Sequence, residues 1–266
     1  MDFTITGREA CRMRSGRVHI AANRENSSKK NELKPWLVKR WCIGKITGDY
    51  IWHMEDILDL YEQPYDPLHP VVCFDERPCQ LLGDVLAPIP MKPGKPKRAD
   101  YEYERHGTCC VLLAFEPLRS WRVVHVRKQR TAVDYALFMK ELVRIYYPNI
   151  TSIRLVQDNL NTHTSGSFYY ALPPQEAFEL AQKFESHYTP LKGSWLNMAE
   201  IELSALAQQC LNRRIGVMAT LTKEATVWSY KRNNARKTVR WAFTKRDARR
   251  KLPINILCCR INLKRH

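Results

Sequence analysis

Three acidic residues stand at places in the sequence where metal-dependent chemistry is common. Asp75 follows the apolar run 71–74, and Asp158 follows the apolar run 153–157. Glu200 lies near the start of a segment with helical periodicity. Carboxylates that follow buried strands lie where α/β folds place their active sites. Such acids also occur in α/β proteins that bind no metal, so the spacing alone leaves both interpretations open.

The chemistry that these acids would support is the cutting and joining of phosphodiester bonds. Two Mg²⁺ ions about 3.5–4 Å apart activate the attacking oxygen and stabilise the leaving oxygen. Because Mg²⁺ prefers carboxylate oxygens and keeps several waters, two or three acids are enough. We expect Asp75 to bridge both ions, Asp158 to hold one and Glu200 to hold the other. Glu76 would point to the opposite side of an extended strand, and Glu202 lies roughly 200° around the helix from Glu200.

Other catalytic chemistries have weaker support in the sequence. The chain contains neither a Gly-x-Ser-x-Gly nucleophile motif nor a Walker-type glycine-rich loop. His163 and His187 have no cysteine or second histidine at metal-ligand spacing. We therefore interpret both histidines as hydrogen-bonding or substrate-contacting residues.

The elements that would position the three acids follow from hydrophobic periodicity and from turn and capping residues. In chain order they are a helix from Asp49 to about Tyr61, a strand ending at Asp75, strands at 107–115 and 121–126, a helix from Thr131, a strand at 153–157, a helix around 174–184, a short segment at 187–190 and helices at 196–213 and 222–233. This order predicts an α/β fold with a mixed sheet flanked by helices, of the ribonuclease H type.

Two of the predicted helices carry apolar positions that are expected to pack on the sheet. In the helix from Thr131 these positions are Val133, Leu137, Leu142 and Ile145. In the helix at 196–213 they are Ala199, Leu203, Leu206 and Cys210. Glu200 lies one residue from this second stripe, at its edge, where it could face an active-site cleft.

The charge of the chain indicates a polyanionic partner. The 266 residues include 43 Lys and Arg against 27 Asp and Glu, a formal net charge of +16, and nucleic acid is the commonest partner of such proteins. The proline-rich stretch 83–98 predicts a protruding, DNA-contacting loop through Lys92, Lys95, Lys97 and Arg98. The strongest basic patch, 230–251, would contribute Lys231, Arg232, Arg236, Lys237 and Arg240. Solvated basic surfaces explain both compositions as well.

Composition excludes several other classes of protein. A hydrophobic fraction of 44% supports a folded core, and no run of about 18 apolar residues predicts a membrane span. The arginine-rich N-terminal segment lacks the apolar run that a secretion signal contains. None of the nine cysteines forms a Cys-x-x-Cys pair, which favours free thiols in a reducing cytoplasm.

Four segments of the sequence resemble the mariner-related family of bacterial insertion-sequence transposases. They are Cys-Phe-Asp-Glu-Arg-Pro-Cys-Gln-Leu at 73–81, Asp-Tyr-Glu-Tyr-Glu-Arg-His-Gly-Thr at 100–108, Val-Gln-Asp-Asn-Leu-Asn-Thr-His at 156–163 and the stretch 187–203, which contains Asn-Met-Ala-Glu at 197–200. The resemblance extends from roughly residue 30 to residue 252, and the motifs agree in order and spacing.

The resemblance implies a DDE catalytic core of the ribonuclease H and integrase type. Asp75 and Asp158 match the family's first and second metal-binding Asp, and Glu200 matches its final Glu, after an interval of 41 residues (159–199). Family members cut transposon ends with Mg²⁺, for which Mn²⁺ can substitute, and join the 3′-OH to target DNA, typically at TA. They act as dimers or larger assemblies on double-stranded DNA. Asn159, His163 and Asn197 lie within the matching motifs and are expected to support the acids.

Both ends of the chain depart from the family pattern. Residues 1–30 do not resemble the helix-turn-helix region that recognises transposon ends, and the tail 253–266, with Cys258 and Cys259, also differs. We expect a truncated or frame-disrupted copy with a complete catalytic core and weak or absent recognition of transposon ends. We divide the chain into 1–30, poorly ordered; 31–69, linker and helix; 70–215, ribonuclease H-like DDE core; and 216–266, a basic helical C-terminal region.

Three hypotheses of function therefore follow from the sequence. The leading one is a DDE transposase core in the bacterial cytoplasm, associated with the nucleoid, with neither a membrane nor a small-molecule substrate as partner. The second is a DNA-binding transposase remnant that is catalytically idle. The third is a ribonuclease H-type nuclease, which would prefer RNA–DNA hybrids over duplex ends.

Overall fold

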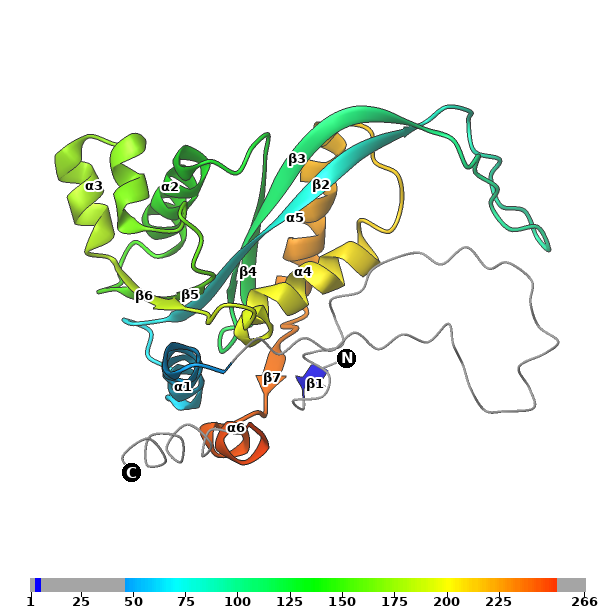
Figure 1. The fold of residues 1–266 in the computed structure, drawn as a ribbon. Coiled ribbons are helices and arrows are strands. Elements are labelled where there is room, and N and C mark those ends of the chain that lie inside the picture. Colours follow the sequence, from blue (N-terminus) through cyan, green and yellow to red (C-terminus); the bar gives the residue numbers. More distant parts are fainter. Residues whose placement is uncertain (1–2, 6–45, 253–266) are drawn as a thin grey trace, which may run out of the picture.

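A five-stranded mixed sheet forms the centre of the protein, whose computed structural model describes residues 3–5 and 46–252. The strands are β2 (Val71–Asp84), β3 (Tyr103–Glu116), β4 (Trp121–Arg127), β5 (Ile153–Gln157) and β6 (Phe184–Tyr188). Their order is β4-β3-β2-β5-β6 (Figure 1). The β2–β3 and β3–β4 pairs are antiparallel, whereas β2–β5 and β5–β6 are parallel. This arrangement confirms the predicted mixed α/β sheet.

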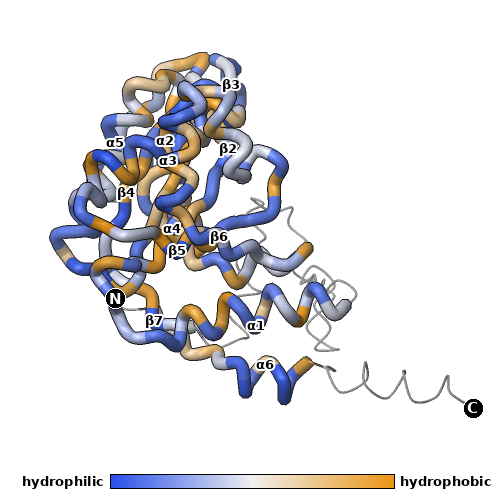
Figure 2. Tube along the Cα trace, turned by 90° about the vertical axis from the view of Figure 1, so that its left-hand side faces the viewer, coloured by the Kyte–Doolittle hydropathy of each residue, from blue (hydrophilic) through white to orange (hydrophobic). Residues whose placement is uncertain are grey.

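Helices cover both faces of the sheet. One face carries α2 (Ala132–Glu141), continued by a π-helical turn at Leu142–Tyr146, and α3 (Pro174–Ala181). The other face carries α1 (Gly48–Glu62), α4 (Met198–Gln209) and α5 (Met218–Asn234). The short, hydrophilic α6 (Lys245–Lys251) lies beside α1 (Figure 2). A separate parallel pair joins β1 (Phe3–Ile5) to β7 (Val239–Trp241).

The alternation of side chains along β2 decides which face of the sheet each residue meets. Cys73 belongs to the buried cluster under α1, α4 and α5, whereas Val72 and Phe74 belong to the cluster under α2 and α3. Successive side chains of a strand point to opposite faces. Asp75 therefore lies on the α4 face, and Glu76 lies on the α2 face.

β2 is much longer than the sequence indicated. The prediction that this strand ends at Asp75 is wrong, because antiparallel pairing with β3 continues to Asp84. Parallel pairing with β5 stops at Cys73, so beyond that residue β3 is the strand that pairs with β2. Pro78, which has no N–H to donate, is tolerated in this half-paired part of the strand.

The stretch after β2 forms the predicted protruding hairpin. Isolated bridges join Ile89 to Arg98 and Lys92 to Lys95. We call residues 85–102 the arm; it projects away from the sheet (Figure 1). At its base, the guanidinium of Arg214 donates to the Asp84 carboxylate and to backbone carbonyls of residues 100–102.

The helices agree with the sequence in position and only partly in orientation. In α4, Ala199, Leu203 and Leu206 are buried, as predicted, whereas the fourth predicted position, Cys210, follows the helix and is half-buried. In α2 the predicted buried face is wrong except for Leu142 in the following turn, because Val133 and Leu137 are exposed, as is Ile145. The buried side chains of α2 are Tyr135, Ala136, Phe138 and Met139. This second stripe has the same helical spacing and larger side chains, so it covers more of the sheet. α1 is capped by Thr47 rather than by Asp49.

Several sequence predictions concern residues outside the described ranges. Apart from β1, the N-terminal segment 1–30 lies there, as do Cys258 and Cys259. The cysteines of the described chain are all free thiols: Cys73, Cys79, Cys109, Cys110 and Cys210. Among residues 3–5 and 46–252, no helix has the length and apolar character needed to cross a membrane.

Candidate active site

Asp75 and Asp158 lie side by side in register at the place where β2 and β5 separate. The last parallel pair of these strands is Cys73 with Val156, and each Asp lies two residues beyond its member of that pair. Cys73 and Val156 belong to the same buried cluster, under α4. Because strand side chains alternate with a period of two, Asp75 starts from the α4 face of the sheet, and Asp158 follows directly after the end of β5.

Helix α4 brings Glu200 to the same place. Asn197 caps the helix: its side-chain oxygen accepts a hydrogen bond from the Ala199 N–H at 3.1 Å. The Asn197 amide nitrogen donates to the carbonyl oxygen of Phe74 at 2.7 Å. One buried side chain thus fastens the start of α4 to the residue before Asp75. Glu200, in the first turn of α4, is thereby held opposite Asp75.

The electrostatics of the site are those of acids that repel one another. Burial raises the pKa of Asp75 to about 8, and the negative charges of Glu200 and Asp158 add to this shift. A hydrogen bond at 2.7 Å from the Glu76 N–H opposes it. Within the described chain, neither Asp75 nor Glu200 forms an ion pair with a basic side chain. Burial of like charges without a basic partner is typical of functional sites.

His163 is the neighbour of Asp158. Its Nδ1 donates to the Asp158 Oδ1 at 2.5 Å, and the ring is buried. Burial by itself would lower the pKa of His163, but interactions with Asp158 and Glu76 raise it to about 9. The His163 carbonyl accepts hydrogen bonds from the Gln157 side-chain amide and the Tyr188 hydroxyl. These contacts hold the turn after β5 in one conformation.

The three predicted supporting residues have different environments in the structure. His163 and Asn197 both contact elements of the site, whereas the Asn159 side chain is exposed. Glu76, which the sequence placed on the opposite face of the strand, does lie there. Its Oε2 nevertheless comes within 3.8 Å of the His163 Nε2. Strand alternation could predict the face of Glu76, but nothing in the sequence indicates this contact.

The chemistry of the site suits a divalent cation, although the side chains have not converged around one. In the described part of the chain, no three His, Cys, Asp or Glu side chains form a ready metal-binding group. The donor atoms are carboxylate oxygens, which Mg²⁺ and Mn²⁺ prefer. Burial and the repulsion between the acids both raise the pKa of Asp75, and a cation between Asp75, Asp158 and Glu200 would offset that repulsion. By this electrostatic test the residues fit a divalent metal.

Most of the basic residues predicted to contact DNA are at the surface. Those on the arm are exposed, as are Lys231, Arg236 and Arg240, while Lys237 is half-buried. Arg232 is different, because it is buried and donates two hydrogen bonds to Glu202, at 3.0 and 2.6 Å. A side chain committed to a buried carboxylate cannot reach a phosphate, so we leave Arg232 out of the DNA contacts.

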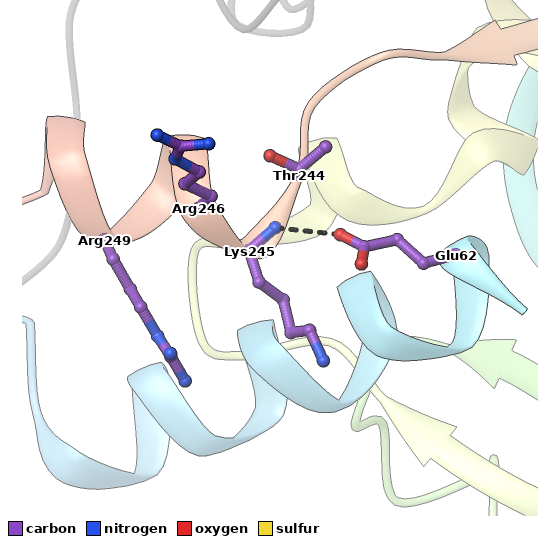
Figure 3. Close-up of a pocket in the computed structure, with 5 residues that line it drawn as sticks. All are labelled: Glu62, Thr244, Lys245, Arg246 and Arg249. Atoms are coloured by element: carbon purple, nitrogen blue, oxygen red, sulfur yellow. Dashed lines mark hydrogen bonds between the residues drawn. The ribbon is translucent and has the colours of Figure 1, made fainter.

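A pocket between α1 and α6 contains none of the three acids (Figure 3). It is lined by Glu62, Thr244, Lys245, Arg246 and Arg249. The Lys245 N–H donates to Glu62 at 3.2 Å, and the Lys245 ammonium pairs with Asp59. Arg249 forms a bidentate pair with Glu55, with both distances at 2.7 Å. Acids of α1 thus neutralise part of the basic patch.

Comparison with known proteins agrees with the fold. Two solved structures are similar: the Mos1 mariner paired end complex with Mn, and the Mos1 transposase paired-end complex with left transposon end. Each has a TM-score of 0.51 and 16% sequence identity, and each match covers 76% of this chain and 60% of that chain. No curated protein sequence matches the chain. The structural likeness, with the strand order above, defines a ribonuclease H-like fold.

The family follows from the sequence match. The model of the DDE superfamily endonuclease matches residues 70–222, which is more than half of the chain. The chain therefore belongs to the DDE superfamily endonuclease family. The matched segment contains Asp75, Asp158 and Glu200.

Proposed function

We propose that this chain is the catalytic core of a DDE transposase, which cuts DNA and joins the freed strand to target DNA. The observation that carries the proposal is the register of Asp75 and Asp158 at the separation of β2 and β5, with Glu200 held opposite by Asn197. Membership of an endonuclease family supports the cutting reaction. The similar solved structures are transposase complexes with paired transposon ends, which supports the strand-joining part.

In this proposal Asp75, Asp158 and Glu200 hold two Mg²⁺ ions, or Mn²⁺ in their place. The ions would supply Lewis-acid stabilisation of charge on the phosphate and its oxygens. The protein holds Asp75 on β2 and Asp158 directly after β5, and the two hydrogen bonds of Asn197 position the start of α4, which carries Glu200. One of the similar structures contains Mn, which supports a divalent cofactor.

Double-stranded DNA is the proposed partner, as transposon ends and as a target that is typically TA, bound by a homodimer in the cytoplasm at the nucleoid. The arm offers Lys92, Lys95, Lys97 and Arg98, and the region after α5 offers Lys231, Arg236, Lys237 and Arg240. These cations would contact phosphates, which carry no sequence information. The net charge of +16 supports a polyanionic partner.

The test is metal-dependent nicking of supercoiled plasmid by the wild type and by Asp158→Asn. We expect nicking with Mg²⁺ or Mn²⁺ and its loss in the variant, because Asn keeps the shape of Asp and removes the anionic ligand. DNA binding without nicking in the wild type would contradict catalysis and identify a DNA-binding remnant. Preferred cleavage of RNA–DNA hybrids over transposon-end duplexes would contradict the transposase and favour a ribonuclease H-type nuclease.

The arm contacts are tested by the salt dependence of DNA binding. Replacing Lys92 and Lys95 with Ala should reduce the slope of log K against log salt by about 2, since each phosphate contact contributes about one. The matched control replaces Lys245 and Arg249, which are already paired with Asp59 and Glu55. This control should change the slope less; equal slopes in both double variants would contradict the arm contacts.

A further inference from the structure

The imidazole of His163 lies between two carboxylates, that of Asp158 directly after β5 and that of Glu76 in β2. Its Nδ1 donates to the Asp158 Oδ1 at 2.5 Å, and its Nε2 lies 3.8 Å from the Glu76 Oε2. Asp158 is one of the three acids of the candidate site, whereas Glu76 points to the α2 face. The ring therefore connects the candidate site with Glu76, just beyond the last β2–β5 pair.

The Glu76 side chain is more buried than is usual for a carboxylate. Only 5% of it is exposed, and its Oε1 is a buried oxygen without a hydrogen-bond partner in the described chain. Its nearest basic neighbour besides His163 is Arg130, whose NH1 lies 3.5 Å from Oε1. The His163 Nε2 is likewise buried without a hydrogen bond. A buried carboxylate is costly unless it is paired, and Glu76 has two basic neighbours: Arg130 is exposed, whereas His163 is buried beside it.

The ring of His163 is fixed on all sides. Tyr135 stacks on it with ring centroids 5.0 Å apart, and Phe74 packs edge-on at 5.2 Å. The hydroxyl of Tyr135 donates to Gln157, whose amide donates to the His163 carbonyl. Backbone and ring are thus held by the same group of side chains. A fixed donor at Nδ1 takes one oxygen of Asp158 and leaves the other oxygen free for a cation.

We propose that Glu76 and His163 form a positioning pair that sets the orientation of the Asp158 carboxylate toward the metal. This inference rests on the proposed function, because it concerns the cation that Asp158 would hold. Hydrogen-bonded partners of metal ligands fix ligand orientation, and their loss typically weakens metal binding about 10–100-fold. Glu76 would keep His163 turned so that Nδ1, rather than Nε2, faces Asp158.

Two substitutions of His163 separate positioning from packing. His163→Asn places an amide nitrogen where Nδ1 lies and can still donate to Asp158. His163→Gln places its amide near the position of Nε2, toward Glu76, and leaves Asp158 without its donor. Both remove the ring from between Tyr135 and Phe74, so both should lower the unfolding midpoint to a similar extent. Only the positioning role predicts a difference between them in metal affinity.

His187 provides a matched control elsewhere in the fold. Its Nδ1 contacts Asp56 at 2.8 Å and its Nε2 lies 3.6 Å from Glu185, so it too is a largely buried histidine between two carboxylates. Neither of those acids belongs to the proposed metal site. His187→Asn and His187→Gln should therefore leave Mn²⁺ affinity at the wild-type value.

The experiment is titration of the full chain with Mn²⁺ without DNA, below the unfolding midpoint of every variant, with free Mn²⁺ followed by electron paramagnetic resonance. We expect His163→Gln to weaken Mn²⁺ binding about 10–100-fold and His163→Asn to weaken it less than about tenfold. Glu76→Gln should weaken it in the same direction. Equal Mn²⁺ affinities for the two His163 variants would contradict the positioning role of Glu76 and His163. Asp158→Asn, measured beside them, should abolish binding. A wild type that neither binds Mn²⁺ nor nicks plasmid would overturn the proposed function itself.

Discussion

Two carboxylates on α4, separated by one residue, have opposite environments. Glu202 is fully buried between two arginines: the Arg122 Nε lies at 3.0 Å and the Arg232 NH2 at 2.6 Å. Glu200 is half-buried, faces Asp75 and has no basic partner in the described chain. Two residues along a helix turn a side chain by roughly 200°, so the two acids meet different neighbours.

The contrast separates an acid that holds the fold together from an acid that is available for chemistry. Glu202 joins α4 to β4 and α5 through its two arginines. Burial lowers the pKa of Arg122 to about 10 even though Glu202 opposes this shift, which shows how strongly the pair is desolvated. Around Glu200 and Asp75 the protein instead gathers like charges, which destabilise the metal-free fold. Such local conflict is expected where function, rather than stability, selects the residues.

The largest expected effect is on activity. Glu200→Gln should reduce metal-dependent nicking about 10³–10⁴-fold, equivalent to roughly 4–5.5 kcal/mol, because a neutral amide no longer neutralises the cation. The fold should persist, since Glu200 forms no ion pair in the described chain. Nicking rates and unfolding curves measured on one preparation check both parts. Nicking at the wild-type rate would show that Glu200 is not a ligand.

The converse substitution should act on stability. Glu202→Gln leaves Arg122 and Arg232 buried without their counter-charge, and breaking a buried ion pair in this way costs about 3–5 kcal/mol. Urea unfolding of this variant beside Glu200→Gln measures the difference. Two variants of equal stability would remove the distinction between the acids.

A pH series can measure how strongly burial and the neighbouring acids oppose ionisation of Asp75. Its pKa is about 8 in the folded protein and near 3.9 in an unfolded chain. Between these values the folded state holds a proton that the unfolded chain releases. This group therefore makes stability fall as pH rises from about 4 to about 8, by up to about 1.4 kcal/mol per pH unit.

The measurement for Asp75 is urea unfolding of the metal-free protein at pH 6 and pH 8. Wild type should lose more stability than Asp75→Asn, in which the group does not titrate. Subtracting the stability profile of the variant from that of the wild type removes the titrations that the two proteins share. Parallel profiles would mean that Asp75 is already ionised at pH 6.

The smallest effect is expected at Asn197, which caps α4 and joins the start of that helix to β2. Asn197→Ala removes the cap of α4 at a cost of about 1 kcal/mol, and it also removes the bond to the Phe74 carbonyl. Asn197→Ser keeps a capping oxygen but is too short to hold that bond. If the bond positions Glu200, both variants should weaken Mn²⁺ binding, while only the Ala variant loses the cap. Wild-type Mn²⁺ affinity in the Ser variant would limit Asn197 to capping.

Local pattern was sufficient for some elements and insufficient for others. β5 has the bounds predicted from its apolar run, 153–157, because a short buried strand between polar turns has few alternatives. The buried stripe of α4 was also predictable. The buried face of α2 was not, since two apolar stripes share that helix and only the sheet decides between them. The length of β2 depends on β3, a partner that the sequence of β2 does not reveal.

The sequence by itself determined which acids the chain carries, their order and the chemistry that carboxylates can do with a divalent cation. It also determined the excess of positive charge. Only the tertiary structure decided which charges are neutralised, because ion pairs such as Glu202 with Arg232 join residues distant in the chain. The contact of Glu76 with His163 depends in the same way on the register of β2 against β5. Residue type sets what a side chain can do, and strand register and helix phase set what it meets.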